Sequence, residues 1–154
     1  MTHRPGRGTR DRYGGPVLRI SRSAHLQMLG HAISGLPNEA CGLMGGPWGQ
    51  GLVEVFVPTR NADASAKTYS IGPDGFAAAD AALGPRGLDV VGVTHSHTHT
   101  DPYPSPTDVA QADNPLLEGW HYVIVSLRDT EPMLRCWLLD GGTIVEEPVE
   151  VVED

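Results

Sequence analysis

The sequence predicts a single α+β domain in which helices alternate with β-hairpins and pack against a sheet. The chain has 154 residues, the length of one ordinary domain, and 40% of them are hydrophobic. Its 19 glycines and 13 prolines divide it into short segments whose hydrophobic patterns fit either a helix or a strand. We find no internal repeat. The composition is that of a loop-rich globular domain and excludes a fibrous or disordered chain.

The N-terminal region divides into a tail and the first two elements of the domain. Residues 1–16 combine Arg, Gly and Pro without hydrophobic periodicity, so we expect a flexible basic tail. The domain should then occupy residues 17–154 and begin with a short strand over 17–20. Ser21 or Ser23 can cap the helix that follows. The apolar residues of this helix recur with three-to-four spacing, at Leu26, Leu29, Ile33 and Leu36.

The middle of the chain predicts a hairpin, a helix and a long buried strand. Residues 41–46 and 51–57 are two strand-like runs joined by a short turn. Residues 67–71 form a third short strand. The alanine-rich run 73–83 begins with Pro, which is typical of the first turn of a helix. The run 88–94 is β-branched and almost continuously apolar, as in a strand that is covered on both faces.

The C-terminal part of the domain predicts three further strands. Runs 122–127 and 133–139 have the composition of strands. Residues 140–142, Asp-Gly-Gly, form a hairpin turn into the run 143–152. Pro148 lies within this last run and cannot donate a backbone hydrogen bond, so we expect an edge strand there.

The distribution of charge and cysteine limits the possible functions. The formal net charge is −8, yet six of the 11 basic residues lie among the first 22 residues with a single acid. The remainder carries five bases and 18 acids, a net charge of −13 that repels phosphate, so we expect no nucleic-acid partner. Cys41 and Cys136 are too few for a disulfide scaffold and lack the spacing of a zinc knuckle, and we expect both to be reduced.

The sequence gives no indication of export or membrane insertion. No apolar run approaches the length of about 20 residues that a membrane span needs. The arginines near the N-terminus precede no hydrophobic segment, so we expect no signal peptide. The expected location is the cytoplasm.

The residues that carry chemistry cluster at the end of the long buried strand. His95 and His97 lie there, and residues two apart point to the same side of a strand, so both imidazoles can face one ion. Asp108 lies in a predicted helix over 105–112, where Ser105 as N-cap and Asp108 at the third position have the spacing of a capping box. Two imidazoles and one carboxylate suit zinc and leave a fourth position for water, which is typical of a catalytic site. The cluster predicts a hydrolase.

The segment around these histidines contains no general base, and Glu39 is our candidate for that role. It lies just before the apolar, glycine-rich strand at 41–46. Other nearby residues have more ordinary interpretations. Ser105 can serve as a helix cap alone, His99 is expected to be a solvated loop residue, and Cys41 is expected to be buried strand packing.

With Glu39 included, the sequence resembles the JAMM (MPN-plus) metalloprotease family. The likeness rests on Glu39, the His95-x-His97 pair, Ser105 after seven further residues and Asp108 after two more. It extends over essentially the whole predicted domain. The resemblance implies a single JAMM/MPN domain with a mixed central β-sheet flanked by helices, the cytidine-deaminase-like architecture.

Within this family the chain is most similar to the CysO-cysteine peptidase group, which processes sulfur carriers. Most JAMM proteins have Pro after the second histidine, whereas this chain has Thr98, as in the carrier-processing group. The region of Asn61 and Tyr69, the strand at 121–126 and the Glu-Glu-Pro-Val run at 146–149 are also similar to that group. The resemblance implies a peptidase that releases cysteine after the C-terminal Gly-Gly of a small ubiquitin-like sulfur-carrier protein.

The resemblance also implies a role for each signature residue. His95, His97 and Asp108 would hold Zn²⁺. Glu39 would hold the zinc-bound water and act as general base. Ser105 would help to bind the oxyanion of the tetrahedral intermediate.

Two alternatives remain open, and a third resemblance fails at two positions. The leaving group could be a lysine side chain, as in an isopeptidase or a deubiquitinase-like enzyme. The domain could instead be a non-catalytic MPN scaffold that organises partners. The Thr-His-Ser-His run also resembles the start of the metallo-β-lactamase motif, but that motif needs Asp at position 99 and His at position 100, where this chain has His99 and Thr100. The oligomeric state and the identity of the carrier do not follow from the sequence.

Overall fold

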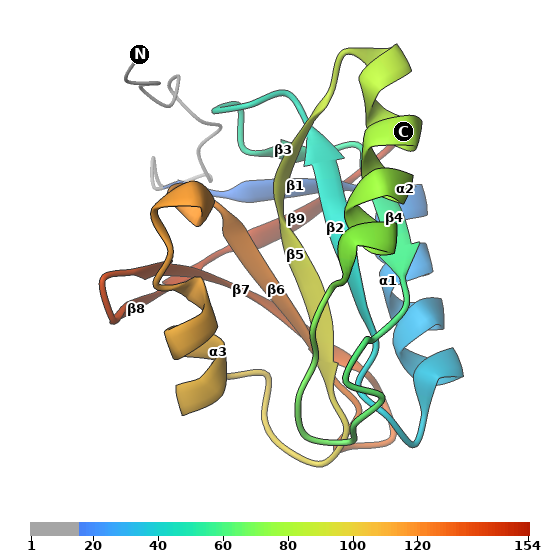
Figure 1. Cartoon of the computed structure of the whole chain (residues 1–154), viewed down its shortest axis with the longest axis vertical. Helices are drawn as coiled ribbons and strands as arrows, with labels where there is room; N and C mark the ends of the chain where they lie inside the picture. The colour runs from blue at the N-terminus through green and yellow to red at the C-terminus, as the bar shows by residue number, and fades with distance from the viewer. Residues whose placement is uncertain (1–15) are drawn as a thin grey trace.

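The computed structural model describes residues 16–154 of the chain. The predicted N-terminal tail, residues 1–16, lies outside these described residues except for Pro16. Two β-sheets and three α-helices make up the described part (Figure 1). None of the helices in this part is long and apolar enough to cross a membrane.

The larger sheet has six strands and combines parallel with antiparallel pairs. Its order is β4 (Val55–Thr59), β2 (Cys41–Gly46), β5 (Asp89–His97), β6 (His121–Ser126), β7 (Met133–Asp140) and β8 (Thr143–Glu147). β5 and β6 are parallel, and every other neighbouring pair is antiparallel. The predicted mixed central sheet is therefore confirmed. β5 lies inside it with a hydrogen-bonded strand on each side, which agrees with its almost continuous apolar sequence.

The smaller sheet joins three segments that are far apart in the sequence. β1 (Leu18–Ser21) pairs in parallel with β3 (Leu52–Val53) on one side and with β9 (Val149–Val152) on the other. Figure 1 shows β1 and β9 behind the six-stranded sheet. An apolar core lies on this side of the larger sheet, and its members include Leu18, Ile20, Met44, Val53, Val123 and Val125.

Two of the predicted strands are each divided between the two sheets. The expected strand 51–57 breaks at Glu54, whose N–H donates to a β2 carbonyl at 2.9 Å, so β3 joins the smaller sheet and β4 the larger. The expected strand 143–152 breaks at Pro148, whose carbonyl accepts from the Leu18 N–H at 2.8 Å. The predictions of continuous strands are wrong at both places. The edge position expected from Pro148 is confirmed, because β8 and β9 are both edge strands.

The first helix, α1 (Arg22–Gly35), forms where the sequence predicts it. Ser21 is its N-cap, and the Ser21 hydroxyl accepts from a backbone N–H of the first turn at 3.2 Å. The buried face, however, consists of the smaller residues and a methionine, namely Ala24, Met28 and Ala32. The predicted apolar positions are mostly on the outside, with exposed fractions of 58% for Leu26, 52% for Ile33 and 48% for Leu36. Small side chains allow close packing on the sheets, so the three-to-four spacing predicted the helix and indicated the wrong face.

The other two α-helices cover the opposite face of the larger sheet. Both α2 (Pro73–Leu83) and α3 (Pro106–Ala112) have the predicted positions. Ala79 and Leu83 of α2 form a core cluster with residues of β2 and β4, and α3 packs against β7. Short 3₁₀ helices follow α2 at Gly84–Arg86 and α3 at Pro115–Leu117.

The predicted strand 67–71 is wrong, because this segment is a loop with one isolated bridge between Asn61 and Ile71. The loop is held by a side chain instead of a neighbouring strand. The Asn61 amide donates to the carbonyls of Thr68 and Glu39, each at 3.0 Å. These bonds fasten the loop to the segment that precedes β2.

Candidate metal centre

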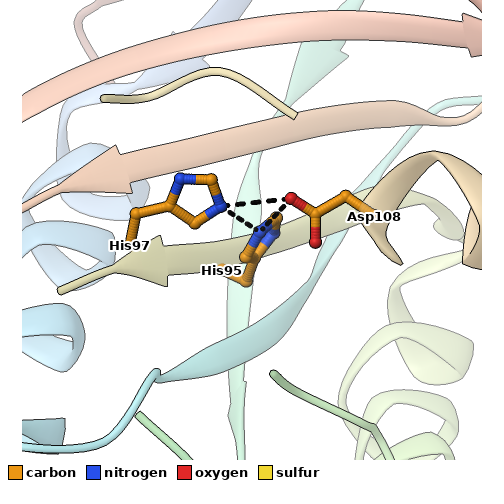
Figure 2. Close-up of side chains that lie close together, drawn as sticks. All are labelled: His95, His97 and Asp108. Carbon is orange, nitrogen blue, oxygen red and sulfur yellow. Dashed lines mark hydrogen bonds and ion pairs between the residues drawn. The ribbon is translucent and has the colours of Figure 1, made fainter. Parts of the chain in front are cut away.

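The C-terminal end of β5 brings two imidazoles together. His95 and His97 are buried, with exposed fractions of 2% and 4%, and they project from the same face of the strand. Their Nε2 atoms lie 3.2 Å apart. The same face carries α2 and α3, so the two rings point away from the smaller sheet and toward the start of α3 (Figure 2).

Asp108 completes a group of three from the first turn of α3. Its Oδ2 atom lies 3.2 Å from His95 Nε2 and 3.1 Å from His97 Nε2 (Figure 2). The capping box predicted from the sequence is confirmed: the Ser105 hydroxyl accepts from the Asp108 N–H at 3.1 Å, and the Ser105 N–H donates to Asp108 Oδ2 at 2.9 Å. This reciprocal pair fixes the carboxylate in front of the histidines.

The electrostatics of the group favour an ionised carboxylate. Burial by itself would raise the pKa of Asp108, but hydrogen bonds from both imidazoles and from the Ser105 N–H hold it well below its usual range. Burial lowers the pKa of His95 in spite of the nearby carboxylate. For His97, burial also acts to lower the pKa, but the contacts with Asp108 and with the Asp101 carbonyl outweigh it and raise the pKa.

The outer nitrogens of the two rings have different surroundings. His97 Nδ1 lies 2.7 Å from the Asp101 carbonyl, and because a carbonyl only accepts, Nδ1 carries the proton. With Nδ1 protonated, Nε2 donates to Asp108 in the charged ring, and in the neutral ring it presents the lone pair that can bind a metal ion. His95 Nδ1 is buried and has no hydrogen-bond partner among the described residues. The Tyr69 ring stacks on the His95 ring with 4.2 Å between the centroids and 21° between the planes, which fixes this second imidazole by packing.

The three donor atoms fit a zinc ion. Two imidazole nitrogens and one carboxylate oxygen are a common donor set for catalytic zinc. Ligands about 2.0–2.1 Å from a tetrahedral ion lie roughly 3.3 Å apart, close to the separations of 3.1–3.2 Å found here. The Nε2 atoms of both imidazoles lie close to the same carboxylate oxygen, Asp108 Oδ2. A cation bound between these three atoms would stabilise this arrangement. Three protein ligands would leave the fourth position of such a zinc ion open to water or substrate.

Glu39 is held in the same region by the backbone. It immediately precedes Ala40, whose N–H donates to the Ser96 hydroxyl at 2.8 Å, between the two histidines in sequence. The Glu39 N–H donates to the Ser65 carbonyl at 2.8 Å. Only 6% of Glu39 is exposed, and this burial, with a smaller opposing effect of His97, raises its pKa to about 7. A carboxyl with this pKa gains and loses a proton readily near neutrality, as general acid–base catalysis requires.

Ser105 can combine the two roles that the sequence suggests for it. It is partly exposed, and its oxygen accepts from the Asp108 N–H as a helix cap. A hydroxyl has one hydrogen as well as two lone pairs, so the hydrogen remains available to donate to an oxygen of a substrate. Capping α3 and binding an oxyanion are therefore compatible in one side chain.

Several supporting residues are not identifiable from chemistry in the sequence. Tyr69 is one of them, although its region is part of the family resemblance. It stacks on His95, and the Asn61 amide holds the adjacent residue Thr68 by its carbonyl. Asp101 is another: its side chain is exposed, but its carbonyl orients His97. A backbone carbonyl leaves no signal in a sequence, so only the fold could reveal this contact.

The predictions for two other nearby residues, His99 and Cys41, are confirmed. His99 is exposed in the loop after β5, as expected. Cys41 is buried in β2, also as expected. His31 of α1 also contacts this region, since its Nε2 lies 2.8 Å from the Cys41 carbonyl and 3.2 Å from the Thr59 carbonyl. These contacts join α1 to the start of β2 and to the end of β4.

Comparison with known proteins identifies close similarities over most of the chain. A family model described as prokaryotic homologs of the JAB domain matches residues 21–140. A CysO-cysteine peptidase from Mycobacterium tuberculosis is 39% identical over 138 residues, which cover 89% of this chain and 92% of that protein. A desampylase from Haloferax volcanii is 32% identical, over 71% of this chain and 80% of that protein. The solution structure of a protein from Desulfitobacterium hafniense superposes with a TM-score of 0.78 at 30% identity, covering 90% of this chain and 94% of that one.

Proposed function

The chain belongs to the prokaryotic JAB (JAMM/MPN) family of hydrolases, and from this membership we propose that it is a zinc-dependent peptidase acting on a small ubiquitin-like sulfur-carrier protein. The bond hydrolysed is the amide after the C-terminal Gly-Gly of the carrier, and the product released is cysteine. The proposal rests above all on the convergence of His95, His97 and Asp108 within 3.2 Å of one another. The similarity to a CysO-cysteine peptidase supports the substrate class.

In this proposal, His95, His97 and Asp108 hold the zinc ion. When bound, zinc polarises the scissile carbonyl and lowers the pKa of water to about 7. The protein contributes orientation: the Asp101 carbonyl fixes the ring of His97, and Tyr69 covers the ring of His95. All three ligand residues are buried, with exposed fractions of 2%, 4% and 7%.

Glu39 acts as the general base and then as the general acid. Its carboxylate takes a proton from the attacking water, and the same carboxyl returns that proton to the leaving amine of cysteine. Its position relative to β5 is fixed by the hydrogen bond between Ala40 and Ser96. A positioned acid–base group contributes roughly a hundred to ten-thousandfold to a rate. Ser105 donates its hydroxyl hydrogen to the oxyanion that develops on the carbonyl.

The proposal is tested with a carrier protein that ends in Gly-Gly-Cys. We expect the wild-type protein with zinc to shorten the carrier by the mass of one cysteine residue, measured by mass spectrometry. Glu39→Gln should bind zinc normally and lose at least a hundredfold in rate, because Gln cannot accept the proton. His95→Ala should lose both the metal and the activity. Hydrolysis by Glu39→Gln at the wild-type rate would contradict the mechanism, and wild-type protein that binds zinc and cleaves no carrier conjugate would indicate a scaffold.

A second substrate is favoured by one observation, the 32% identity to a desampylase. In an isopeptidase reaction the same residues would hydrolyse a carrier joined through Gly-Gly to a lysine side chain. Both substrates should be offered to the enzyme in parallel. We expect a higher kcat/KM for the cysteine conjugate, and a preference for the lysine conjugate would reassign the leaving group.

The surroundings of the site agree with a cytoplasmic enzyme that meets a protein. Both cysteines are free and buried, which suits a reducing compartment. The net charge of −13 on residues 23–154 opposes nucleic-acid binding and favours a carrier with a basic surface. We therefore propose the cytoplasm as the location and a protein, not a nucleic acid, as the partner.

A further inference from the structure

A second group of metal-ligating side chains lies on the other face of the six-stranded sheet. It consists of His121 at the start of β6, Cys136 in β7 and Glu147 at the end of β8. Cys136 is in register with Val123 on one side and with Glu147 on the other. His121 precedes Val123 by two residues, so the three side chains share one face. The histidines of β5 pair with β6 residues of the opposite parity, so the two groups are separated by the sheet.

The three side chains meet at one carboxylate oxygen. His121 Nδ1 lies 2.6 Å from Glu147 Oε1, and the Cys136 thiol donates to the same oxygen at 3.5 Å. All three ligand atoms lie within 4.8 Å of one another. Cys136 is completely buried, and the Glu147 side chain is 6% exposed. The His121 side chain is 17% exposed and gives the group a route to solvent.

Binding of a divalent cation would replace the protons that now lie between these side chains. The N–H of His121 and the S–H of Cys136 both point at Glu147 Oε1, so the hydrogens occupy the space between three donor atoms. In a tetrahedral zinc site, bonds of about 2.0–2.3 Å place the ligands roughly 3.3–3.5 Å apart. The sulfur–oxygen distance already has this value. The distance of 2.6 Å between His121 Nδ1 and Glu147 Oε1 must lengthen by about 0.7 Å, and the His121 ring lies at the partly exposed edge of the group.

We propose that His121, Cys136 and Glu147 form a second metal site, which takes a divalent ion of the zinc class and is distinct from the centre at the end of β5. A thiolate, an imidazole and a carboxylate together are donors for zinc or cobalt and poor donors for magnesium or calcium. Binding displaces the thiol proton to solvent and leaves His121 protonated on Nε2. The ion ties β6, β7 and β8 together immediately before Pro148, where the chain leaves the larger sheet for β9.

Cobalt titration of the full-length protein tests this proposal independently of activity. A thiolate ligand gives a sulfur-to-cobalt charge-transfer band in the near ultraviolet, and the centre at the end of β5 has no sulfur ligand. We expect wild-type protein to bind two equivalents of Co²⁺ and to show the band. The double variant His95→Ala, Asp108→Asn should bind one equivalent and keep the band. Cys136→Ser should also bind one equivalent, but without the band.

Matched variants keep the result interpretable. Cys41 is the other cysteine of the chain and lies on the same face of the sheet as the first centre, where its thiol contacts Thr59, so Cys41→Ser should keep the band. If Cys136→Ser does not fold, His121→Gln at the partly exposed position replaces it and should weaken cobalt binding at the second site at least tenfold. The proposal is overturned if saturating cobalt gives no charge-transfer band, or if the band survives in Cys136→Ser. Failure at this site leaves the proposed peptidase activity untouched, since carrier hydrolysis depends on the other face of the sheet.

Discussion

Replacing Ser105 with Ala separates the structural role of this residue from its proposed catalytic role. The hydroxyl caps α3 by accepting from the Asp108 N–H at 3.1 Å, and losing a serine cap costs about 1 kcal/mol of stability. For a domain of this size, that loss lowers Tm by roughly 2–4 °C. The Ser105 N–H remains and still donates to Asp108, so the carboxylate should stay in place and zinc should still bind. Loss of an oxyanion donor lowers kcat by about a hundredfold or more.

The two effects are measured on the same protein sample. Thermal unfolding gives the stability change, and steady-state hydrolysis of the carrier–cysteine conjugate gives kcat and KM separately. We expect kcat to fall while KM changes little, because the oxyanion forms only after binding. Ser105→Thr retains a hydroxyl and should recover both properties. If Ser105→Ala shows the expected fall in Tm and keeps kcat within about threefold of wild type, Ser105 is a helix cap alone and the catalytic assignment is wrong.

Three further predictions concern packing and metal. Met28→Ala should lower the free energy of unfolding by about 2–5 kcal/mol, because Met28 lies on the buried face of α1. Leu26→Ala, on the exposed face, should change it by less than about 0.5 kcal/mol. Urea denaturation measures both changes, and equal losses would mean that the buried face of α1 is assigned incorrectly. Trp137→Phe removes the indole N–H that donates to the Pro102 carbonyl at 2.8 Å and should cost about 1–3 kcal/mol in the same assay; an unchanged midpoint would contradict this. Zinc at about 100 times its Kd should add about 2.7 kcal/mol of stability to the folded protein. A chelator should therefore lower Tm clearly in wild type and less in Asp108→Asn. Identical Tm shifts in the two proteins would show that Asp108 holds no metal.

The candidate metal centre was largely predictable because its residues lie in two short segments with local rules. Residues two apart in a strand share a face, which brings His95 and His97 together. The capping box fixes how Asp108 enters α3. Neither rule gives the distance between the two segments. Their meeting depends on the loop between β5 and α3, which the indole of Trp137 fastens at Pro102.

The elements that were predicted wrongly are those whose partners lie far away in the sequence. The breaks at Glu54 and Pro148 arise because β3 and β9 pair with β1 in a separate sheet. No local sequence pattern predicts that pairing. The buried face of α1 depends on how closely the helix approaches the sheets, which favours Ala24 and Ala32 over the larger leucines. Periodicity predicts that a helix exists, but close packing chooses its face.

The proposed second metal site also could not be predicted from local sequence patterns. His121, Cys136 and Glu147 lie on three different strands and share no motif or spacing. They meet only because the register of β6, β7 and β8 places them side by side. A cysteine that looks like ordinary core packing in the sequence thereby becomes a possible ligand.

The most direct test of the central claim is anomalous diffraction at the zinc absorption edge, from crystals of the protein grown with zinc. We predict an anomalous peak about 2.0–2.2 Å from each of His95 Nε2, His97 Nε2 and Asp108 Oδ2. The peak should disappear in crystals of His95→Ala, with the fold unchanged. If wild-type crystals grown with saturating zinc show no anomalous peak between these three atoms, the assignment of this site as the metal centre is wrong.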